Sequence, residues 1–249
     1  MFSHMARKRK TLLVVVVALV VVFGVLILAG PTLQRSFFYP KPRDLPPVVG
    51  QTTSQLLTRL QAVLETNAPI VVRALQPGLS DSQISTLESQ GAFRLSEDLR
   101  ALYHWHNGMS SNSAIGLLAG QRFLPLDEMV LERTLEHQEV GSATSVQRAA
   151  FAVFVGHKKS WLQVLDDGAG DGYFYDPKRT DAEGAFFYNS AENGYYVWFP
   201  SLRNFLAGVI ECFETRAVKT ASDSTSLDED FHQTQKIWER LGKTSETGG

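Results

Sequence analysis

Arg94-Leu-Ser-Glu-Asp-Leu-Arg-Ala-Leu-Tyr-His-Trp-His-Asn-Gly108 predicts a short amphipathic helix with a marked start and end. Ser96 can cap the first turn, and the acidic Glu97 and Asp98 lie near the positive end of the helix dipole. Asn107-Gly108 supplies residues that tolerate the left-handed conformation in which many helices end. One face is apolar at helical spacing, and it is formed by Leu95, Leu99, Leu102, Tyr103 and His106.

The remaining pattern changes from a helical to an alternating period along the chain. Apolar spacing and capping residues predict further helices over residues 52–66, 80–91, 125–137 and 201–215. Short aromatic and β-branched runs predict strands over 151–155, 161–165, 172–175, 184–188 and 195–198. A further short strand is expected near residues 115–118. Their short connections favour an antiparallel meander. We therefore expect one α+β domain over residues 51–219, with a mostly antiparallel sheet flanked by helices, and a polar, partly disordered tail over 220–249.

The N-terminal part has a different composition. Residues 1–10 end in four consecutive basic residues. Residues 11–30 carry no charge, and this segment is long enough for a transmembrane helix. A cleaved signal peptide is the alternative, but its apolar region is usually shorter and ends in small residues. Residues 31–50 predict an extended, Pro-rich linker. The basic cluster favours a cytoplasmic N-terminus, so the C-terminal domain is expected outside the cytoplasm as part of a single-pass membrane protein.

The charge balance limits the class of partner. The chain has 24 Lys and Arg against 26 Asp and Glu, and removing residues 1–30 with their four basic residues leaves 20 against 26, a net charge of −6. An acidic domain argues against nucleic acid as the partner and is compatible with a basic protein. The single cysteine, Cys212, excludes an internal disulfide and, between Ile210 and Phe213, is expected to be a buried structural residue.

Three stretches carry a resemblance to a known family. They are residues 95–108, residues 161–177 and the segment from the aromatic strand ending at Trp198 to Leu206, with Ile84 and Glu88 upstream. In this order and spacing the chain resembles the SUKH superfamily, in particular its cell-wall assembly regulators. The motif positions, to which the resemblance assigns a structural role, are Leu95, Leu99, Tyr103, Asn107, Gly108, Trp161, Gly170, Asp171, Asp176, Trp198 and Phe205.

The resemblance implies an α+β fold, no catalytic activity and no cofactor. It also implies a protein partner, since bacterial members neutralise toxins by direct binding and fungal members act as scaffolds in cell-wall synthesis. The membrane span departs from the family pattern, because most members are soluble. Ser96 departs too, at a position where proline is frequent, although both residues suit a helix start.

The clustered aspartates Asp166, Asp167, Asp171 and Asp176 have two interpretations. Hard cations favour such carboxylates, but the spacing does not match the EF-hand pattern. Asp and Gly are also the residues that tight turns require, and this second interpretation is favoured, so no metal is expected. Asp166, Asp167 and Asp171 are also the only obvious acids for an enzyme of the glycan hydrolase class, which needs two carboxyl groups flanking a cleft.

Two other short patterns carry less weight. His104 and His106 are two residues apart on a helix, so they point in different directions and cannot easily share one metal ion. His106 is expected on the core face and His104 on the exposed face. Ser110-Ser-Asn-Ser113 contains no nucleophile elbow.

The sequence therefore favours a membrane-anchored, non-catalytic protein-binding module whose partner is a toxin or a cell-envelope factor. The alternatives are a cell-envelope enzyme that uses the clustered aspartates and a purely structural subunit of an envelope complex. Candidate contacts with the partner are His104, Asp166, Asp167, Tyr173 and Tyr175.

Overall fold

The fold begins with two short helices that follow one another closely. A computed structural model describes residues 50–131, 134, 161–169, 171–176, 185–189 and 195–246. Helix α2 (Thr53–Asn67) starts with a capping box in which Thr52 and Gln55 each satisfy a backbone N–H of the other. Helix α3 (Pro69–Ala74) has proline in its first turn, where a missing N–H costs no hydrogen bond.

The next two helices match their predicted starts. Helix α4 (Asp81–Gly91) has a capping box formed by Ser80 and Gln83, and helix α5 (Glu97–Trp105) is capped by Ser96. Helix α5 ends at His106, because the chain there becomes extended and forms strand β2 (His106–Met109), which pairs with β1 (Leu75–Pro77). The prediction that Asn107-Gly108 ends the helix in a left-handed turn is therefore wrong in detail, and Gly108 has its positive φ of 68° inside the strand.

A six-stranded antiparallel sheet forms the second layer, in the order β10-β7-β6-β5-β4-β3. Its strands are β3 (Arg122–Phe123), β4 (Leu162–Asp166), β5 (Gly172–Asp176), β6 (Ala185–Asn189), β7 (Tyr195–Phe199) and β10 (Lys243–Glu246). The run from β4 to β7 is the predicted meander, and a separate two-stranded hairpin joins β8 (Val218–Thr220) to β9 (Leu227–Glu229). The α+β fold class with antiparallel sheets is confirmed.

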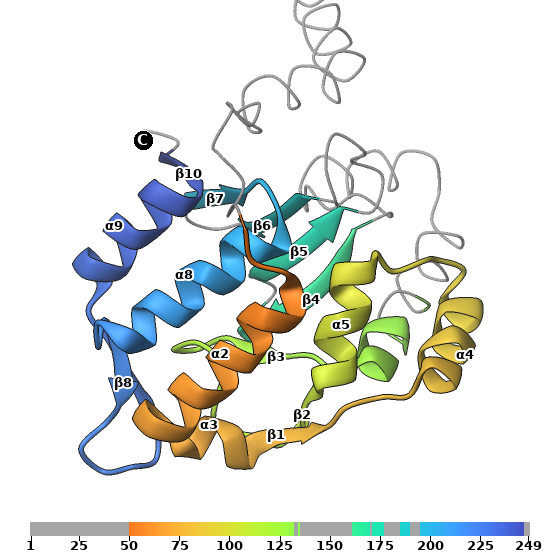
Figure 1. The fold of residues 1–249 in the computed structure, drawn as a ribbon, viewed down its shortest axis with the longest axis horizontal. Coiled ribbons are helices and arrows are strands. Elements are labelled where there is room, and N and C mark those ends of the chain that lie inside the picture. Colours follow the sequence, from red (N-terminus) through yellow and green to blue (C-terminus); the bar gives the residue numbers. More distant parts are fainter. Residues whose placement is uncertain are drawn as a thin grey trace, which may run out of the picture. The chain divides into compact units, whose positions relative to one another are not determined.

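Helix α8 (Leu202–Glu214), capped by Ser201, is the central helix of the core. It lies beside α2 and packs on β6 and β7, while helix α9 (Phe231–Leu241) lies on its other side (Figure 1). Phe205 contacts rings from the sheet and from α9, at centroid distances of 4.9 Å to Tyr173, 4.5 Å to Phe186 and 6.1 Å to Trp238. These aromatic contacts tie both helices to the sheet.

The C-terminal segment extends the packed region beyond the predicted boundary at residue 219. Residues 220–249 contain α9, with Ile237 and Trp238 buried, and β10, which pairs with β7 from Lys243 to Glu246. The sequence of this polar tail predicts one or two amphipathic turns around Phe231, Ile237, Trp238 and Leu241, and the structure has the longer helix α9 there. The sequence does not predict strand β10, because an edge strand is held by backbone hydrogen bonds that need no apolar side chain.

Other predictions meet the described residues only in part. The strand expected near residues 115–118 is reduced to an isolated bridge between Leu118 and Gln121. The helix expected over 125–137 is seen as helical residues 126–131 and 134, and the strand expected over 151–155 lies outside the described residues. So do residues 11–30, with their predicted transmembrane helix, and the linker up to residue 49. Within the described ranges, no helix is both long and apolar enough to cross a bilayer.

Candidate functional site

The aspartates of the β4–β5 hairpin form its turn. Asp166 Oδ1 accepts a hydrogen bond from the Gly168 N–H at 2.8 Å, and Asp167 Oδ1 accepts from Ala169 at 2.8 Å and Asp171 at 3.1 Å. These are the side-chain-to-backbone bonds by which aspartate stabilises tight turns. Among the described residues, no group of three or more His, Cys, Asp or Glu could hold a metal ion. The turn interpretation accounts for the backbone contacts of Asp166 and Asp167.

The two histidines contact different partners, as their spacing predicts. His104 Nδ1 lies 2.7 Å from the Leu79 carbonyl oxygen, and its Nε2 lies 3.1 Å from Asp81. His106 Nδ1 lies 2.7 Å from the Gln76 carbonyl oxygen. The expectation that His104 is simply exposed is therefore incomplete, because His104 binds Leu79 and the start of α4 to helix α5, whereas His106 of β2 contacts Gln76 of β1.

Tyr173 and Tyr175 do not form a contact surface. They are only 5% and 4% exposed, and all five residues of β5 are buried. Tyr173 packs on Phe186 and Phe205, and burial raises the pKa of the Tyr175 hydroxyl. The expected partner contact at these two tyrosines is wrong, because β5 is an inner strand whose two faces are both covered, so alternation does not expose every second residue.

The first family motif locks α5 and β2 onto the segment that follows β3. The Tyr103 hydroxyl donates to the Leu124 carbonyl at 3.3 Å, and Asn107 Oδ1 accepts from the Leu126 N–H at 2.9 Å. A Cβ on Gly108 would lie 2.4 Å from the Pro125 nitrogen, so this close backbone approach requires glycine. Burial raises the pKa of the Tyr103 hydroxyl.

Most of the other motif positions that the structure describes lie in or beside the core. Trp161 and Phe205 are buried aromatics, Asp176 is a buried polar residue, and Asp171 closes the β4–β5 turn. Trp198 belongs to β7, and Gly170 lies outside the described residues. Leu95 and Leu99 are buried. These placements are those of residues that serve packing.

A buried carboxylate connects α4 with α5. Glu88 is 1% exposed, and it accepts hydrogen bonds from the Leu95 N–H at 2.8 Å, Arg94 at 3.0 Å and Arg100 at 3.1 Å. Arg100 also lies 3.6 Å from Asp81. The charge of Glu88 is thus paired and fully bonded, as burial of a carboxylate requires.

Cys212 has the structural character expected for it. The side chain is buried in α8, and burial, with Glu229 and Glu211 nearby, raises the pKa of its thiol to about 12. A thiol with such a pKa is a poor nucleophile at neutral pH.

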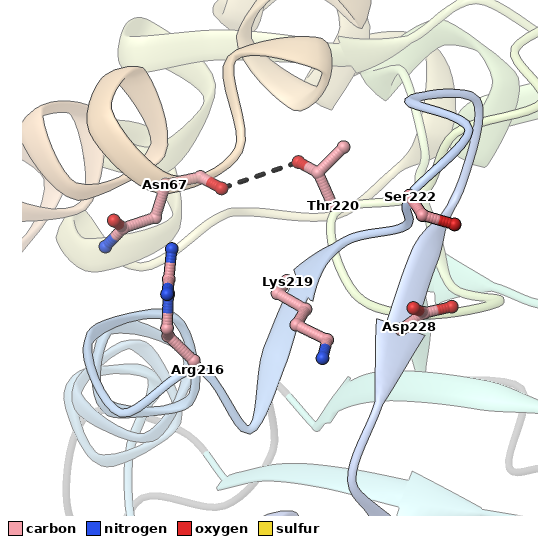
Figure 2. A pocket seen from close by; sticks show the side chains of 6 residues that line it. All are labelled: Asn67, Arg216, Lys219, Thr220, Ser222 and Asp228. Atoms are coloured by element: carbon pink, nitrogen blue, oxygen red, sulfur yellow. Dashed lines mark hydrogen bonds between the residues drawn. The ribbon is translucent and has the colours of Figure 1, made fainter.

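The sequence did not reveal a polar hollow of about 330 Å³ at the ends of α2 and α8. We call it the Arg216 hollow; it is lined by Asn67, Arg216, Lys219, Thr220, Ser222 and Asp228. Figure 2 shows that Asn67 comes from the end of α2, Arg216 follows α8, and the other four residues belong to the β8–β9 hairpin. The hairpin is held against α2 because the Thr220 hydroxyl donates to the Asn67 carbonyl at 3.4 Å.

Arg216 has an unusual backbone. Its φ is 62°, in the left-handed region that favours glycine, and its N–H donates to the Phe213 carbonyl at 3.3 Å to end α8. A non-glycine residue in this left-handed conformation destabilises the fold by about 1 kcal/mol relative to glycine. In sequence, a basic residue after a helix only indicates compensation of the helix dipole, so no local signal marks the hollow.

The fold and these placements define a mixed helix-and-sheet domain whose motif residues hold together its core. A family model, the SMI1 / KNR4 family (SUKH-1), matches residues 78–208, more than half of the 249-residue chain, and the chain belongs to this family. Comparison with curated proteins found no match. All six residues that line the Arg216 hollow lie outside the matched range.

Proposed function

We propose that this chain is a membrane-anchored, non-catalytic protein-binding module of the SUKH type that acts by docking a partner protein. The observation that carries the proposal is the Arg216 hollow, a concave polar site with two basic side chains beside an otherwise closely packed domain. Basic side chains in a concave, solvent-exposed site suit recognition of another molecule.

An exposed aromatic side chain favours a protein as the docked molecule. Phe231 is 60% exposed at the start of α9. The Asp230 N–H donates to the Ala217 carbonyl at 2.7 Å, so a backbone hydrogen bond joins the residue before Phe231 to the residue after Arg216. Aromatic residues and arginine are the types enriched where protein partners bind.

The contacts of the β4–β5 turn weigh against the enzyme alternative. It required Asp166, Asp167 and Asp171 as acids in a cleft, but the turn backbone occupies carboxylate oxygens of Asp166 and Asp167.

The membrane anchor of the proposal is residues 11–30, with residues 1–10 in the cytoplasm and the domain outside it. A reporter fused after Gly249 tests the orientation, because its activity depends on the compartment. A reporter active outside the cytoplasm is expected, and one active only inside contradicts this orientation and favours a cytoplasmic scaffold.

The docking proposal is tested by capture from the native source, with the full-length chain as bait. The matched control is residues 1–50 fused to an unrelated domain, which keeps the basic and apolar segments and removes the folded domain. We expect one protein to be retained in stoichiometric amount by the full chain and not by the control. Retention by both would favour a purely structural role for the anchor, and retention by neither contradicts docking.

A further inference from the structure

The Arg216 hollow holds basic groups that the fold itself does not use. Arg59, Arg94, Arg100, Arg122, Arg203 and Arg240 each lie within 4.0 Å of a carboxylate oxygen. Arg216 and Lys219 have no such ion pair among the described residues, and both are exposed. In a domain whose net charge is negative, two such cations in one hollow are a distinct feature.

The other donors of the hollow are partly occupied. The Asn67 side-chain amide donates to the Phe213 carbonyl at 3.3 Å, and the Thr220 hydroxyl donates to the Asn67 carbonyl. These two bonds fix the end of α2, the end of α8 and the hairpin relative to one another. Arg216, Lys219 and Ser222 remain as the groups that can donate to a ligand. Figure 2 shows the Arg216 guanidinium directed toward Asn67.

The charges in the hollow leave one positive charge uncompensated. Lys219 stands opposite Asp228 in the β8–β9 ladder, so this carboxylate offsets one of the two cations. A single carboxylate would therefore neutralise the hollow. The guanidinium fork of arginine matches the two oxygens of a carboxylate, and arginine does not lose its charge in proteins.

The helix dipoles explain part of this arrangement. α2 and α8 both end at the hollow, and their negative ends favour a nearby cation such as Arg216. This effect requires neither Lys219 nor a concave site lined by polar side chains. It also holds Arg216 in place in the absence of a ligand.

We propose that the Arg216 hollow binds one carboxylate of an acidic side chain on the partner protein, with Arg216 as the main contact and Lys219 as the second. The proposal rests on the proposed docking function and names the chemistry by which the partner is recognised. Asp228 competes with the incoming carboxylate for Lys219 and so sets the affinity.

The probe is a short peptide of Gly and Ser, capped at both ends, with one central glutamate, and the control peptide has glutamine instead. Titration calorimetry at low salt on the full-length chain is expected to show about 5-fold tighter binding of the glutamate peptide, which corresponds to about 1 kcal/mol. Arg216→Gln removes this preference and Lys219→Gln reduces it. Asp228→Asn strengthens binding about 3-fold, because it removes the competing carboxylate. Lys236→Gln, which removes an exposed cation of α9 outside the hollow, leaves the affinity unchanged.

Retention of the captured partner protein by variants of the hollow is the second test of the carboxylate site. Arg216→Glu is expected to reduce its retention by about 10-fold, while Lys236→Glu retains it fully. If the partner is retained equally by wild type and Arg216→Glu, the docking function stands and the carboxylate site is wrong. If no partner is captured, the docking function fails, and the peptide titration still decides whether the hollow binds a carboxylate.

Three results of the peptide titration would also overturn the proposal. One is equal affinity for the glutamate and glutamine peptides. Another is a glutamate preference that survives Arg216→Gln. The third is inorganic phosphate displacing the peptide at lower concentration than acetate does, which would assign the hollow to a phosphate group.

Discussion

The Glu88 network of the family-matched part and the Arg216 hollow of the flanks use their charged residues in opposite ways. Within residues 78–208, Glu88 is buried and bonded to Arg94, Arg100 and a backbone N–H. In the flanks, Arg216 and Lys219 face a hollow with no ion-pair partner among the described residues. The difference is consistent with the proposal that the matched part serves the fold, whereas recognition is proposed to occur where α2, α8 and the β8–β9 hairpin meet.

The largest effect is expected where the C-terminal flank enters the core. Trp238→Ala removes a ring that is 5% exposed and lies 5.3 Å from Phe199, and it is expected to lower the free energy of unfolding by about 4 kcal/mol. Phe231→Ala, on the same helix but 60% exposed, is the control and changes it by less than about 0.5 kcal/mol. Denaturant unfolding measures both. Equal effects would show that α9 is not part of the folded domain and would remove the structural support of the hollow.

The second-largest loss of stability is expected when the paired charges of the matched part are disrupted. Glu88→Gln removes the buried carboxylate that pairs with Arg100, leaves it the exposed Asp81 carboxylate at 3.6 Å, and is expected to cost about 3 kcal/mol. Glu239→Gln, at an exposed position of α9, is the control and changes stability by less than about 0.5 kcal/mol. Thermal unfolding of both variants checks this. A loss below about 1 kcal/mol in Glu88→Gln would mean that the network is not a structural element.

Alanine substitutions at two glycines with similar backbone angles distinguish the cost of a steric clash from the cost of a positive φ. Gly108 and Gly120 have φ of 68° and 70°, but only Gly108 would place a Cβ against backbone, whereas Gly120 has nothing within 4 Å. Gly120→Ala is expected to cost about 1 kcal/mol, and Gly108→Ala about 2 kcal/mol more. Equal losses of unfolding free energy would contradict the role of Gly108 in locking β2 onto residues 124–126.

The smallest effect concerns Cys212, whose thiol has a raised pKa of about 12. At pH 8 the thiolate fraction is on the order of 1 in 10,000, so alkylation of the folded chain should be at least about 100-fold slower than alkylation of the unfolded chain. Because the folded thiol stays neutral while the unfolded thiol ionises with a pKa of about 8.5, raising the pH from 6 to 9 should lower stability through this group by about 0.5–1 kcal/mol. Mass spectrometry after iodoacetamide treatment measures the rate. Modification of the folded chain at the unfolded rate would show that Cys212 is accessible.

Sequence reasoning predicted the local features best. The caps at Ser80, Ser96 and Ser201 and the strands from β4 to β7 follow from short-range physics, since a cap or a hairpin is decided within a few residues. The family resemblance, drawn from residues 95–108, 161–177 and 198–206, was confirmed by the model match to residues 78–208.

The features that sequence reasoning missed depend on distant residues. The burial of Tyr173 depends on which layers cover β5, and the hollow joins Asn67 to Thr220 across 153 residues. Strand β10 pairs with β7 through the backbone, so its side chains can be polar and its sequence gives no apolar strand pattern. No periodicity within a local window reports these relations.

The most direct test measures the affinity of the glutamate peptide for Glu88→Gln and Arg216→Gln side by side, at a temperature where both are folded. If the matched part serves the fold and the flank serves recognition, Glu88→Gln lowers stability but binds the peptide like wild type. Arg216→Gln then keeps wild-type stability and loses the glutamate preference. Equal loss of affinity in both variants, or wild-type affinity in Arg216→Gln, would contradict this division of roles.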